Sequence, residues 1–282
     1  MTALAEAVDA EFDSWGVDFG GCAVLDRTGI LASAGDLASL LPWASVTKIA
    51  SALAVLSVAA DGLLDLDAPA GPEGSTVRHL LAHASGLAFD DDRVLSAPGR
   101  RRVYSNVGID LAVAAATYAA AAPDAATLLA DRVLVPLGMS HTELAGPPAH
   151  GMRGPVSDLA LLAAELLEPC VLPPGIVAQA RTDNYPGLGG VLPGFGRQDP
   201  NDWGLGLELR GAKSPHWMAA QASPASFGHF GQAGSFLWVD PDRGLAAVAL
   251  TGTPFGPWAS TAWPVSSARW MEIADGSGDG DA

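Results

Sequence analysis

Two residues in the N-terminal part of the chain have the types and the spacing needed for nucleophilic catalysis. Ser45 and Lys48 lie in the segment S-V-T-K, at the beginning of an apolar stretch that predicts a helix. One helical turn places positions i and i+3 on the same face, so the Lys48 amine can lie beside the Ser45 hydroxyl. A serine is a weak nucleophile until a base takes its proton, and burial converts a lysine into such a base. The pair therefore predicts attack by Ser45 on a carbonyl carbon, with the N–H groups of the helix start available to the developing oxyanion.

The scarcity of lysine makes Lys48 a stronger candidate. Of the 15 basic residues, 13 are Arg and only two, Lys48 and Lys213, are Lys. A GC-rich genome also produces such a bias, and the S-x-x-K spacing is common by chance. Lysine is nevertheless the basic side chain that can lose its proton when it is desolvated, whereas arginine cannot. A lysine at the start of an apolar stretch is therefore a candidate base.

Two other short segments could complete a site for acyl transfer. Tyr104 and Asn106 adjoin an apolar stretch over 107–122 that predicts a helix, and a tyrosine near a lysine can exchange protons with the serine. The segment His229–Gln232 precedes a predicted strand over 235–239, where glycine-flanked backbone lets a substrate approach N–H groups closely. Each segment alone also fits a structural role, as an aromatic residue before a helix cap or as a buried histidine.

In this order and at these distances, the three segments resemble the serine β-lactamase and penicillin-binding-protein superfamily, closest to its class C branch and the family VIII carboxylesterases. S-x-x-K opens the pattern of that superfamily, and Y-S-N at 104–106 is similar to the Y-x-N of class C. Further similar segments are T-V-R-H-L-L-A-H-A-S-G-L at 76–87, P-G-R-R-R-V-Y-S-N at 98–106, V-L-V-P-L-G-M at 133–139, W-G-L-G at 203–206 and G-H-F-G-Q-A-G-S at 228–235. The resemblance covers nearly the whole chain, from about residue 15 to residue 265.

The resemblance implies a role for each residue of the three segments. Ser45 is the expected nucleophile, and Lys48 is its base or hydrogen-bond partner. Tyr104 is the expected general base for acylation and the proton donor to the leaving group, so either Lys48 or Tyr104 can take the first proton. Asn106 is expected to orient Lys48 and the substrate, and the backbone N–H groups of Ser45 and Gln232 are expected to form the oxyanion hole. The resemblance implies neither a metal nor an organic cofactor.

The third segment departs from the superfamily in an informative way. Its usual K-T-G is replaced by His229, Phe230 and Gly231, so the fixed positive charge and the hydroxyl that hold a substrate carboxylate are both missing. Histidine is largely neutral at pH 7. A carboxylate would therefore lose a charge-assisted hydrogen bond, each worth about 1.5–3 kcal/mol. This substitution favours substrates without that carboxylate.

The leading functional hypothesis is a serine hydrolase that forms an acyl-enzyme on Ser45, specifically a carboxylesterase for small neutral esters. The closest alternative is a D-amino-acid amidohydrolase or peptidase, because H-x-G segments occur in D-amino-acid amidohydrolases of the superfamily as well as in its esterases. A weak β-lactamase is the third candidate. A catalytically retired member that binds a ligand or a partner is a hypothesis of another class. The intact Ser45, Lys48, Tyr104 and Asn106 argue against it.

Other residues favour structural interpretations. His79 and His83 lie at i and i+4 of a predicted helix but lack the glutamate of H-E-x-x-H, so no metal site is predicted. Asp90, Asp91 and Asp92 indicate a solvated loop. Four tryptophans can line an acyl pocket or belong to the core: Trp203, Trp217, Trp258 and Trp263.

The elements needed to position these residues follow from the apolar patterning. Helices are predicted at 2–14, 45–60, 76–84, 107–122 and 261–273, strands at 20–35 (a hairpin), 204–209, 235–239 and 245–251, and a loop-rich region at 173–200. Strands at both ends of the chain with helices between them predict an α/β (α+β) class fold of the β-lactamase/transpeptidase type: an antiparallel sheet flanked by helices, plus an inserted helical lobe.

The same pattern predicts one domain over residues 1–274. Its sheet lobe comprises about 1–43 and 200–274, its helical lobe about 44–199, and residues 275–282 are expected to form a disordered acidic tail.

Composition limits the partners. With 31 acidic and 15 basic residues, the net charge of −16 disfavours binding to nucleic acids and to anionic membrane surfaces. The longest apolar runs, 49–60 and 111–122, are too short to span a bilayer, and the acidic N-terminus does not resemble a signal peptide. These features predict a cytoplasmic protein whose partner is a small-molecule ester or amide substrate.

Overall fold

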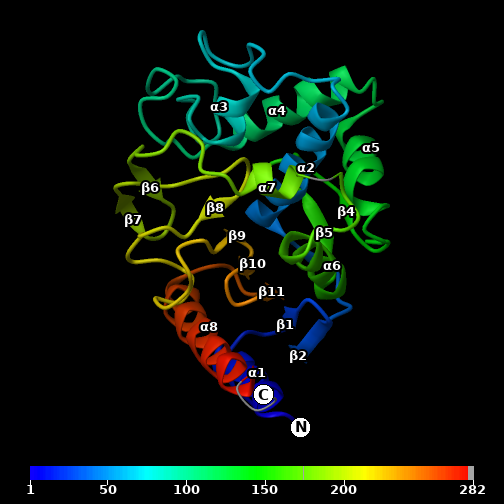
Figure 1. Cartoon of the computed structure of the whole chain (residues 1–282), viewed down its shortest axis with the longest axis vertical. Coiled ribbons are helices and arrows are strands. Elements are labelled where there is room, and N and C mark those ends of the chain that lie inside the picture. The colour runs from blue at the N-terminus through cyan, green and yellow to red at the C-terminus, as the bar shows by residue number, and fades with distance from the viewer. Residues whose placement is uncertain (174, 279–282) are drawn as a thin grey trace.

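The computed structural model describes residues 1–173 and 175–278 (Figure 1). Its helices are α1 (Ala3–Ser14), α2 (Thr47–Ala60), α3 (Val77–Leu81), α4 (Asn106–Ala119), α5 (Ala125–Leu129), α6 (Val156–Leu167), α7 (Ile176–Ala180) and α8 (Pro257–Gly278), with two further helical turns, η1 (Ala44–Val46) and η2 (Ala130–Leu134). Its strands are β1 (Gly20–Asp26), β2 (Gly29–Gly35), β3 (Leu41–Pro42), β4 (Glu143–Leu144), β5 (Met152–Gly154), β6 (Gly190–Leu192), β7 (Gly196–Gln198), β8 (Glu208–Leu209), β9 (Phe227–Gly231), β10 (Ser235–Asp240) and β11 (Leu245–Thr251).

The central sheet takes its strands from both ends of the chain. Its order is β2-β1-β11-β10-β9-β8, and each neighbouring pair is antiparallel. Residues of β1 alternate between two hydrophobic cores: Cys22 and Val24 belong to one, and Ala23 and Leu25 to the other. Because both faces of the sheet are covered, its inner strands are continuous apolar runs. The architecture confirms the predicted fold class.

Different helices cover the two faces of the sheet. α1 packs against β1, β2 and α8, and the Trp15 indole donates a hydrogen bond to Ser266 Oγ at 2.9 Å, which ties these two terminal helices together. α6 packs against β1, β10 and β11 and contributes to the other core. The sheet thus lies between the two terminal helices and the helices of the middle of the chain.

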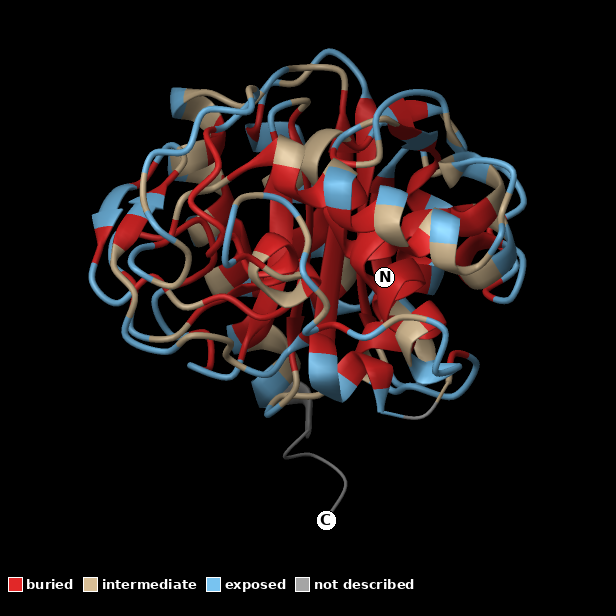
Figure 2. Cartoon of the chain, turned by 90° about the horizontal axis from the view of Figure 1, so that it is seen from above, coloured by how far each residue is buried: buried red, intermediate tan, exposed pale blue. Residues whose placement is uncertain are grey.

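The helix α2 runs through the centre of the helical part of the molecule. It packs against α4, α5, α7 and η2, and its residues from Thr47 to Val58 are buried. In Figure 2 buried residues fill the interior of the molecule, while the exposed ones lie on the peripheral loops and outer helix faces. A helix enclosed in this way is apolar on all sides. Lys48, in its first turn, is therefore enclosed as well.

Several predicted elements differ in extent from the observed ones. The helix predicted over 45–60 starts as the tight turn η1 before α2 begins. The strand predicted over 204–209 is shorter, because only Glu208–Leu209 pairs with β9. The loop-rich region at 173–200 contains α7 and the hairpin of β6 and β7.

The C-terminal helix is longer than predicted. α8 extends to Gly278 and so includes residues 275–278 of the tail expected to be disordered, while 279–282 lie outside the described residues. Among the described helices, none is both long and apolar enough to cross a membrane.

Candidate active site

Ser45 lies in a tight turn at the head of α2. The backbone of the preceding residue, Ala44, has a φ of 45°, a left-handed conformation that is costly for a residue with a side chain. Trp43 anchors the turn, because its N–H donates to the carbonyl of Met152 at 2.9 Å and its carbonyl accepts from Ser235 Oγ at 2.7 Å. The serine is thereby held between the sheet and α2, one helical turn before Lys48.

Lys48 is completely buried, and three oxygen atoms surround its amine. Nζ lies 2.6 Å from Asn106 Oδ1, 2.9 Å from the carbonyl oxygen of Ala149 and 3.1 Å from Ser45 Oγ. The amide and carbonyl oxygens can only accept hydrogen bonds. A neutral amine therefore directs its two N–H groups at them and leaves its lone pair for the hydroxyl hydrogen of Ser45.

The charge state of Lys48 agrees with this arrangement. Burial lowers the pKa of its ammonium from 10.5 to about 7, although the carboxylates of Asp110 and Asp90 act in the opposite direction. Near pH 7 a large fraction of the amine is consequently neutral and can accept a proton. The side chain is thus both positioned and poised as a base.

Asn106, the first residue of α4, holds the lysine in place. Its Nδ2 donates to Asp90 Oδ1 at 2.7 Å, which fixes the orientation of the amide and turns Oδ1 toward Lys48. The preceding Ser105 caps α4 by accepting the N–H of Gly108 at 3.1 Å. Asp90 lies in an exposed loop, as expected, and the structure also connects it to the lysine through the Asn106 side chain.

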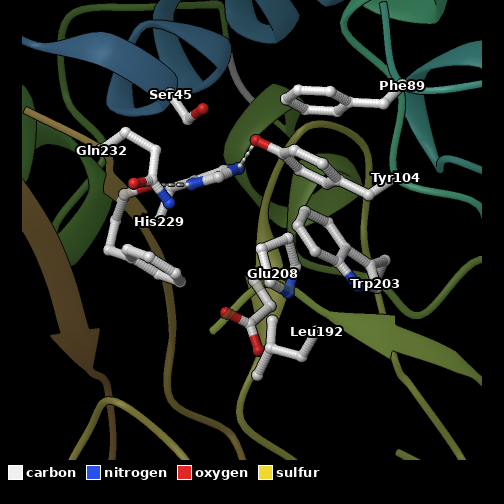
Figure 3. Close-up of a pocket in the computed structure, with 10 residues that line it drawn as sticks. Ser45, Phe89, Tyr104, Leu192, Trp203, Glu208, His229 and Gln232 are labelled. Carbon is white, nitrogen blue, oxygen red and sulfur yellow. Dashed lines mark hydrogen bonds between the residues drawn. The ribbon is translucent and has the colours of Figure 1, made fainter. Parts of the chain in front are cut away.

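Tyr104 lies between Lys48 and the third predicted segment. Its hydroxyl is 3.4 Å from His229 Nε2 (Figure 3), and the centre of its ring is 4.8 Å from Lys48 Nζ. Burial raises the pKa of the phenol above its ordinary value, and the neighbouring Ser45 hydroxyl only partly opposes that change. At neutral pH Tyr104 is therefore a protonated phenol.

His229 has a defined tautomer. Its Nδ1 lies 2.7 Å from the carbonyl oxygen of Phe230, an acceptor, so Nδ1 carries the hydrogen and Nε2 is free to accept. Burial lowers the pKa of the imidazole to about 3, and the charge of Lys48 contributes to the same effect. His229 is thus neutral, and the Tyr104 hydroxyl donates its hydrogen to it.

His83 also contacts Tyr104, and the sequence analysis did not assign it to the site. Its ring centre lies 4.6 Å from that of Tyr104 and 4.7 Å from that of Trp203, and its Nδ1 accepts the N–H of Ser105 at 3.2 Å. Burial holds the pKa of His83 well below its usual value, so the ring is neutral. Only its place two residues before the S-G of the H-A-S-G-L segment could have drawn attention to it.

The third segment lies on β9, next to the serine turn. Phe227 and Gly228 pair with both β8 and β10, whereas residues 229–231 pair with β10 alone among the described strands. Gly231 packs directly against the turn: a Cβ at this position would lie 2.5 Å from the Trp43 carbonyl oxygen and 3.0 Å from Ala44 Cβ. This close approach brings the open end of β9, and Gln232 after it, to Ser45.

These elements enclose a pocket of about 380 Å³. Its lining residues are Ser45, Phe89, Tyr104, Leu192, Pro193, Trp203, Glu208, His229, Phe230 and Gln232. The structure therefore brings the predicted residues together, with Lys48 and Asn106 behind Ser45. Of the four tryptophans, Trp203 lines the pocket, while Trp217 and Trp263 are buried in the core.

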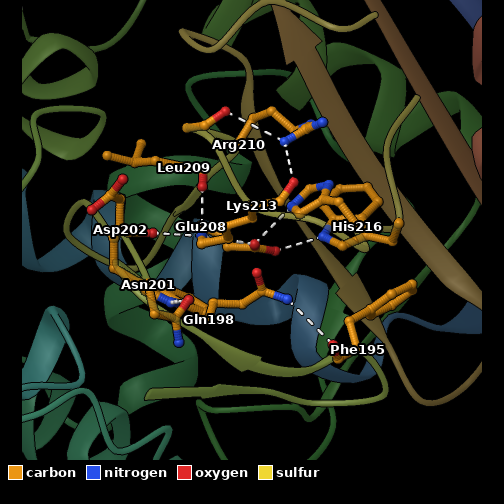
Figure 4. Close-up of polar contacts among 12 residues, drawn as sticks. Phe195, Gln198, Asn201, Asp202, Glu208, Leu209, Arg210, Lys213 and His216 are labelled. Atoms are coloured by element: carbon orange, nitrogen blue, oxygen red, sulfur yellow. Dashed lines mark hydrogen bonds and ion pairs between the residues drawn. The ribbon is translucent and has the colours of Figure 1, made fainter. Parts of the chain in front are cut away.

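The second lysine, Lys213, forms a buried ion pair with Glu208, one of the residues that line the pocket (Figure 4). Glu208 accepts hydrogen bonds from Lys213 Nζ at 2.9 Å, His216 Nε2 at 2.8 Å and Trp217 Nε1 at 2.5 Å. Burial raises the pKa of the Glu208 carboxyl, but Lys213 and His216 lower it by more, so the carboxylate remains charged. Lys213 compensates the Glu208 carboxylate and leaves Lys48 as the amine that faces the serine.

Comparisons with known proteins agree with this geometry. The family model described as Beta-lactamase matches residues 27–265. The crystal structure of a beta-lactamase from Mycobacterium bovis is 44% identical in sequence, with a TM-score of 0.91 over 94% of this chain and 98% of that one. No curated protein sequence matches this chain.

Two more distant structures share the fold. A LovD6 mutant of the simvastatin synthase LovD from Aspergillus terreus is 16% identical, with a TM-score of 0.73 over 96% of this chain and 95% of that chain. The octameric penicillin-binding protein homologue from Pyrococcus abyssi is 17% identical, with a TM-score of 0.75 over 95% of this chain and 77% of that chain. At these identities the similarity concerns the fold alone.

Proposed function

This chain belongs to the beta-lactamase family, and we propose that it is a carboxylesterase that hydrolyses small esters with a neutral acyl group through an acyl-enzyme on Ser45. The observation that carries the proposal is the arrangement of the Lys48 amine. Two pure acceptors, Asn106 Oδ1 and the Ala149 carbonyl, hold two of its hydrogens, and the remaining direction points to Ser45 Oγ at 3.1 Å.

Acylation begins with proton transfer from Ser45 to Lys48. The serine oxygen attacks the ester carbonyl as its proton moves to the neutral amine, and the resulting oxyanion accepts hydrogen bonds from the backbone N–H groups of Ser45 and Gln232. The low pKa of Lys48 supports it as the first base. A buried, protonated phenol is poorly suited to that step. Tyr104 would first have to lose its own proton, which would place a phenolate anion in the buried pocket.

Tyr104 is suited to the next proton transfer. Its hydroxyl lies beside Ser45 and can pass a proton to the departing alkoxide, after which the ammonium of Lys48 returns a proton to it. His229 keeps the Tyr104 hydroxyl in place by accepting its hydrogen bond. Water then attacks the acyl-enzyme while the same proton transfers run in reverse. This step releases the acid and restores Ser45.

The composition of the pocket supports a neutral acyl group. Leu192, Trp203 and Phe230 present apolar surface. The imidazole of His229, with a pKa of about 3, supplies no positive charge to a substrate carboxylate. Glu208, the charged residue of the lining, is already paired with Lys213. An apolar acyl chain therefore fits this pocket better than an anionic one.

Hydrolysis of p-nitrophenyl butyrate by the wild type and by Ser45→Ala tests the proposal. We expect turnover in the wild type and its loss in the variant, with an unchanged circular dichroism spectrum. Equal turnover in both proteins would exclude Ser45 as the nucleophile. Ser45-dependent turnover of D-aminoacyl p-nitroanilides or nitrocefin, but not of the ester, would instead support the amidohydrolase or β-lactamase hypothesis. Binding of such compounds without any turnover would support a retired binding protein.

A further inference from the structure

A second, wider groove opens next to the catalytic pocket. It has a volume of about 1040 Å³, and it shares Phe89 and Tyr104 with the pocket. Its walls are the segment 100–103 and the start of β6, which are joined by a hydrogen bond of 2.9 Å from the Arg102 N–H to the Gly189 carbonyl. The rings of Phe89 and Tyr104 stack with their centres 5.8 Å apart and form the boundary between the two cavities. A substrate bound at Ser45 can therefore extend past Tyr104 into the groove.

The groove concentrates positive charge on a strongly acidic protein. Four of the 13 arginines in the chain line it: Arg100, Arg101, Arg102 and Arg197. The net charge of the whole chain is −16. A cluster of like charges next to a catalytic pocket raises the local concentration of ligands with the opposite charge.

The side chains of these arginines fall into two groups. Arg102 is buried and donates to the carbonyl oxygens of Ala82, Asn184 and Asn201 at 2.6, 2.8 and 3.1 Å, so its role is structural. Arg100 and Arg101 are exposed, and within the described part of the chain no carboxylate lies at ion-pair distance from either guanidinium.

The third exposed guanidinium, that of Arg197, is already paired with a carboxylate. Arg197 lies 3.3 Å from Asp199, and both side chains are exposed. An exposed pair of this kind contributes little free energy and can open for a ligand. Arg101 donates one hydrogen bond, from Nη2 to the Leu95 carbonyl oxygen at 3.0 Å, and faces no carboxylate. Arg100 and Arg101 are accordingly the guanidiniums that are most available to a bound anion.

We propose that this groove binds an anionic group, a carboxylate or a phosphate, carried by the leaving-group part of the substrate. The inference rests on the proposed esterase function and adds a substrate class to it. Tyr104 is the proposed proton donor to the leaving group, and it borders the groove, so the leaving group lies on the groove side of the scissile bond. The neutral acyl group occupies the apolar pocket, and the guanidiniums of Arg100 and Arg101 form charge-assisted hydrogen bonds with the distal anion.

Matched aryl butyrates test the proposal. 4-(Butyryloxy)benzoate carries a carboxylate on its leaving group, and 4-(butyryloxy)benzamide replaces it with a neutral group of similar shape. The quantity measured is the ratio of kcat/KM for the benzoate to kcat/KM for the benzamide. Comparing this ratio between the wild type and a variant cancels the intrinsic difference in reactivity between the two esters. We expect the double variant Arg100→Ala/Arg101→Ala to lower it roughly tenfold, and added salt to lower it in the wild type.

A charge-matched control separates binding by the groove from the effect of the protein's overall net charge. Arg27→Ala/Arg269→Ala removes the same charge from exposed side chains on the β1–β2 turn and on α8. Arg27 follows β1 at the end of the sheet where Leu25 faces Ala246, whereas the site lies at the opposite end, where Gly231 faces Ser235. We expect the ratio in this control to equal that of the wild type. An equal fall in both double variants would overturn a specific site, as would no fall in Arg100→Ala/Arg101→Ala.

A binding measurement distinguishes failure of this inference from failure of the esterase function. Calorimetric titration of Ser45→Ala with the two esters needs no turnover. Tighter binding of the benzoate than of the benzamide, lost when Arg100 and Arg101 are also replaced, would support the groove even if neither ester is hydrolysed. Equal binding of the two esters would overturn it even if both are hydrolysed. The phosphate analogue 4-phosphonooxyphenyl butyrate, titrated in the same way, shows which of the two anions is preferred.

Discussion

Asp110 is connected to Lys48 through a single residue. Its Oδ1 accepts the N–H of Ala149 at 2.8 Å, and the carbonyl of Ala149 accepts a hydrogen bond from Lys48 Nζ at 2.9 Å. The carboxylate is therefore close enough to favour the ammonium form of Lys48, and it opposes the larger effect of burial. The pKa of the proposed base depends on this balance.

Asp110→Asn removes the charge and keeps an oxygen that can accept the Ala149 N–H. Because Asp110 raises the pKa of Lys48, its neutralisation lowers that pKa, and the ascending limb of kcat/KM moves to lower pH. In the wild type we expect this limb near pH 7. Full pH profiles of p-nitrophenyl butyrate hydrolysis measure the shift. Asp131→Asn, an exposed change on η2, controls for net charge, and coincident profiles of wild type and Asp110→Asn would contradict the prediction.

Burial of Lys48 also affects stability. Its pKa is about 7 in the folded protein and 10.5 when unperturbed, so between these values the unfolded state binds more protons, and stability rises with pH. Lys48→Met lacks this dependence. We expect the wild type to gain about 2 kcal/mol of unfolding free energy relative to Lys48→Met between pH 7 and pH 9. Urea unfolding at both pH values measures the difference, and parallel pH dependence of the two proteins would contradict a low pKa for Lys48.

His229 is expected to act on Tyr104 by accepting its hydrogen bond. His229→Leu removes the acceptor, and His229→Gln supplies a carboxamide oxygen that can replace Nε2. We expect His229→Leu to lower kcat by about tenfold or more, with a smaller change in KM, and His229→Gln to recover part of the loss. Steady-state kinetics of both variants provide the comparison. Equal losses in the two variants would indicate that His229 only fills space.

Gly231 permits the contact between β9 and the serine turn. In Gly231→Ala the new Cβ would meet the Trp43 carbonyl oxygen at 2.5 Å, so β9 must move away from η1, and with it Gln232. We expect at least a hundredfold loss of kcat/KM, because an oxyanion-hole donor contributes about that much. Gly256→Ala is the matched control, since its nearest neighbour atom lies at 3.8 Å. Wild-type activity in Gly231→Ala would contradict the proposed position of the oxyanion hole.

Much of the architecture could be predicted because it depends on how apolar residues are spaced within each segment of the sequence. Alternating burial of β1 residues in two cores explains the continuous apolar strands, and the apolar surroundings of α2 explain its composition. The proximity of Lys48 to Ser45 followed from their spacing in the sequence, and that of Tyr104 from the resemblance to the superfamily. The strand at 204–209 was predicted too long, because its extent depends on pairing with β9 and not on its own composition.

The supporting residues could not be predicted in the same way. Asp110 acts through the backbone of Ala149, and Asp90 acts through Asn106, contacts between segments that are distant in the chain. His83 belongs to a predicted helix, and only its packing against Tyr104 reveals its connection to the site. The pairing of Lys213 with Glu208, which distinguishes it from Lys48, likewise depends on tertiary structure.

The most direct test of the account is covalent labelling of Ser45 by a p-nitrophenyl alkylphosphonate as a function of pH. Intact mass and peptide mapping identify the adduct, and its rate of formation reports proton removal from the serine without a deacylation step. We predict one adduct, on Ser45, formed at a rate that rises through about pH 7. The same label should be strongly slowed in Lys48→Arg, because a permanent cation cannot accept the proton. An equal rate in Lys48→Arg, or an unlabelled Ser45 in the folded wild type, would contradict the assignment of Ser45 and Lys48 as nucleophile and base.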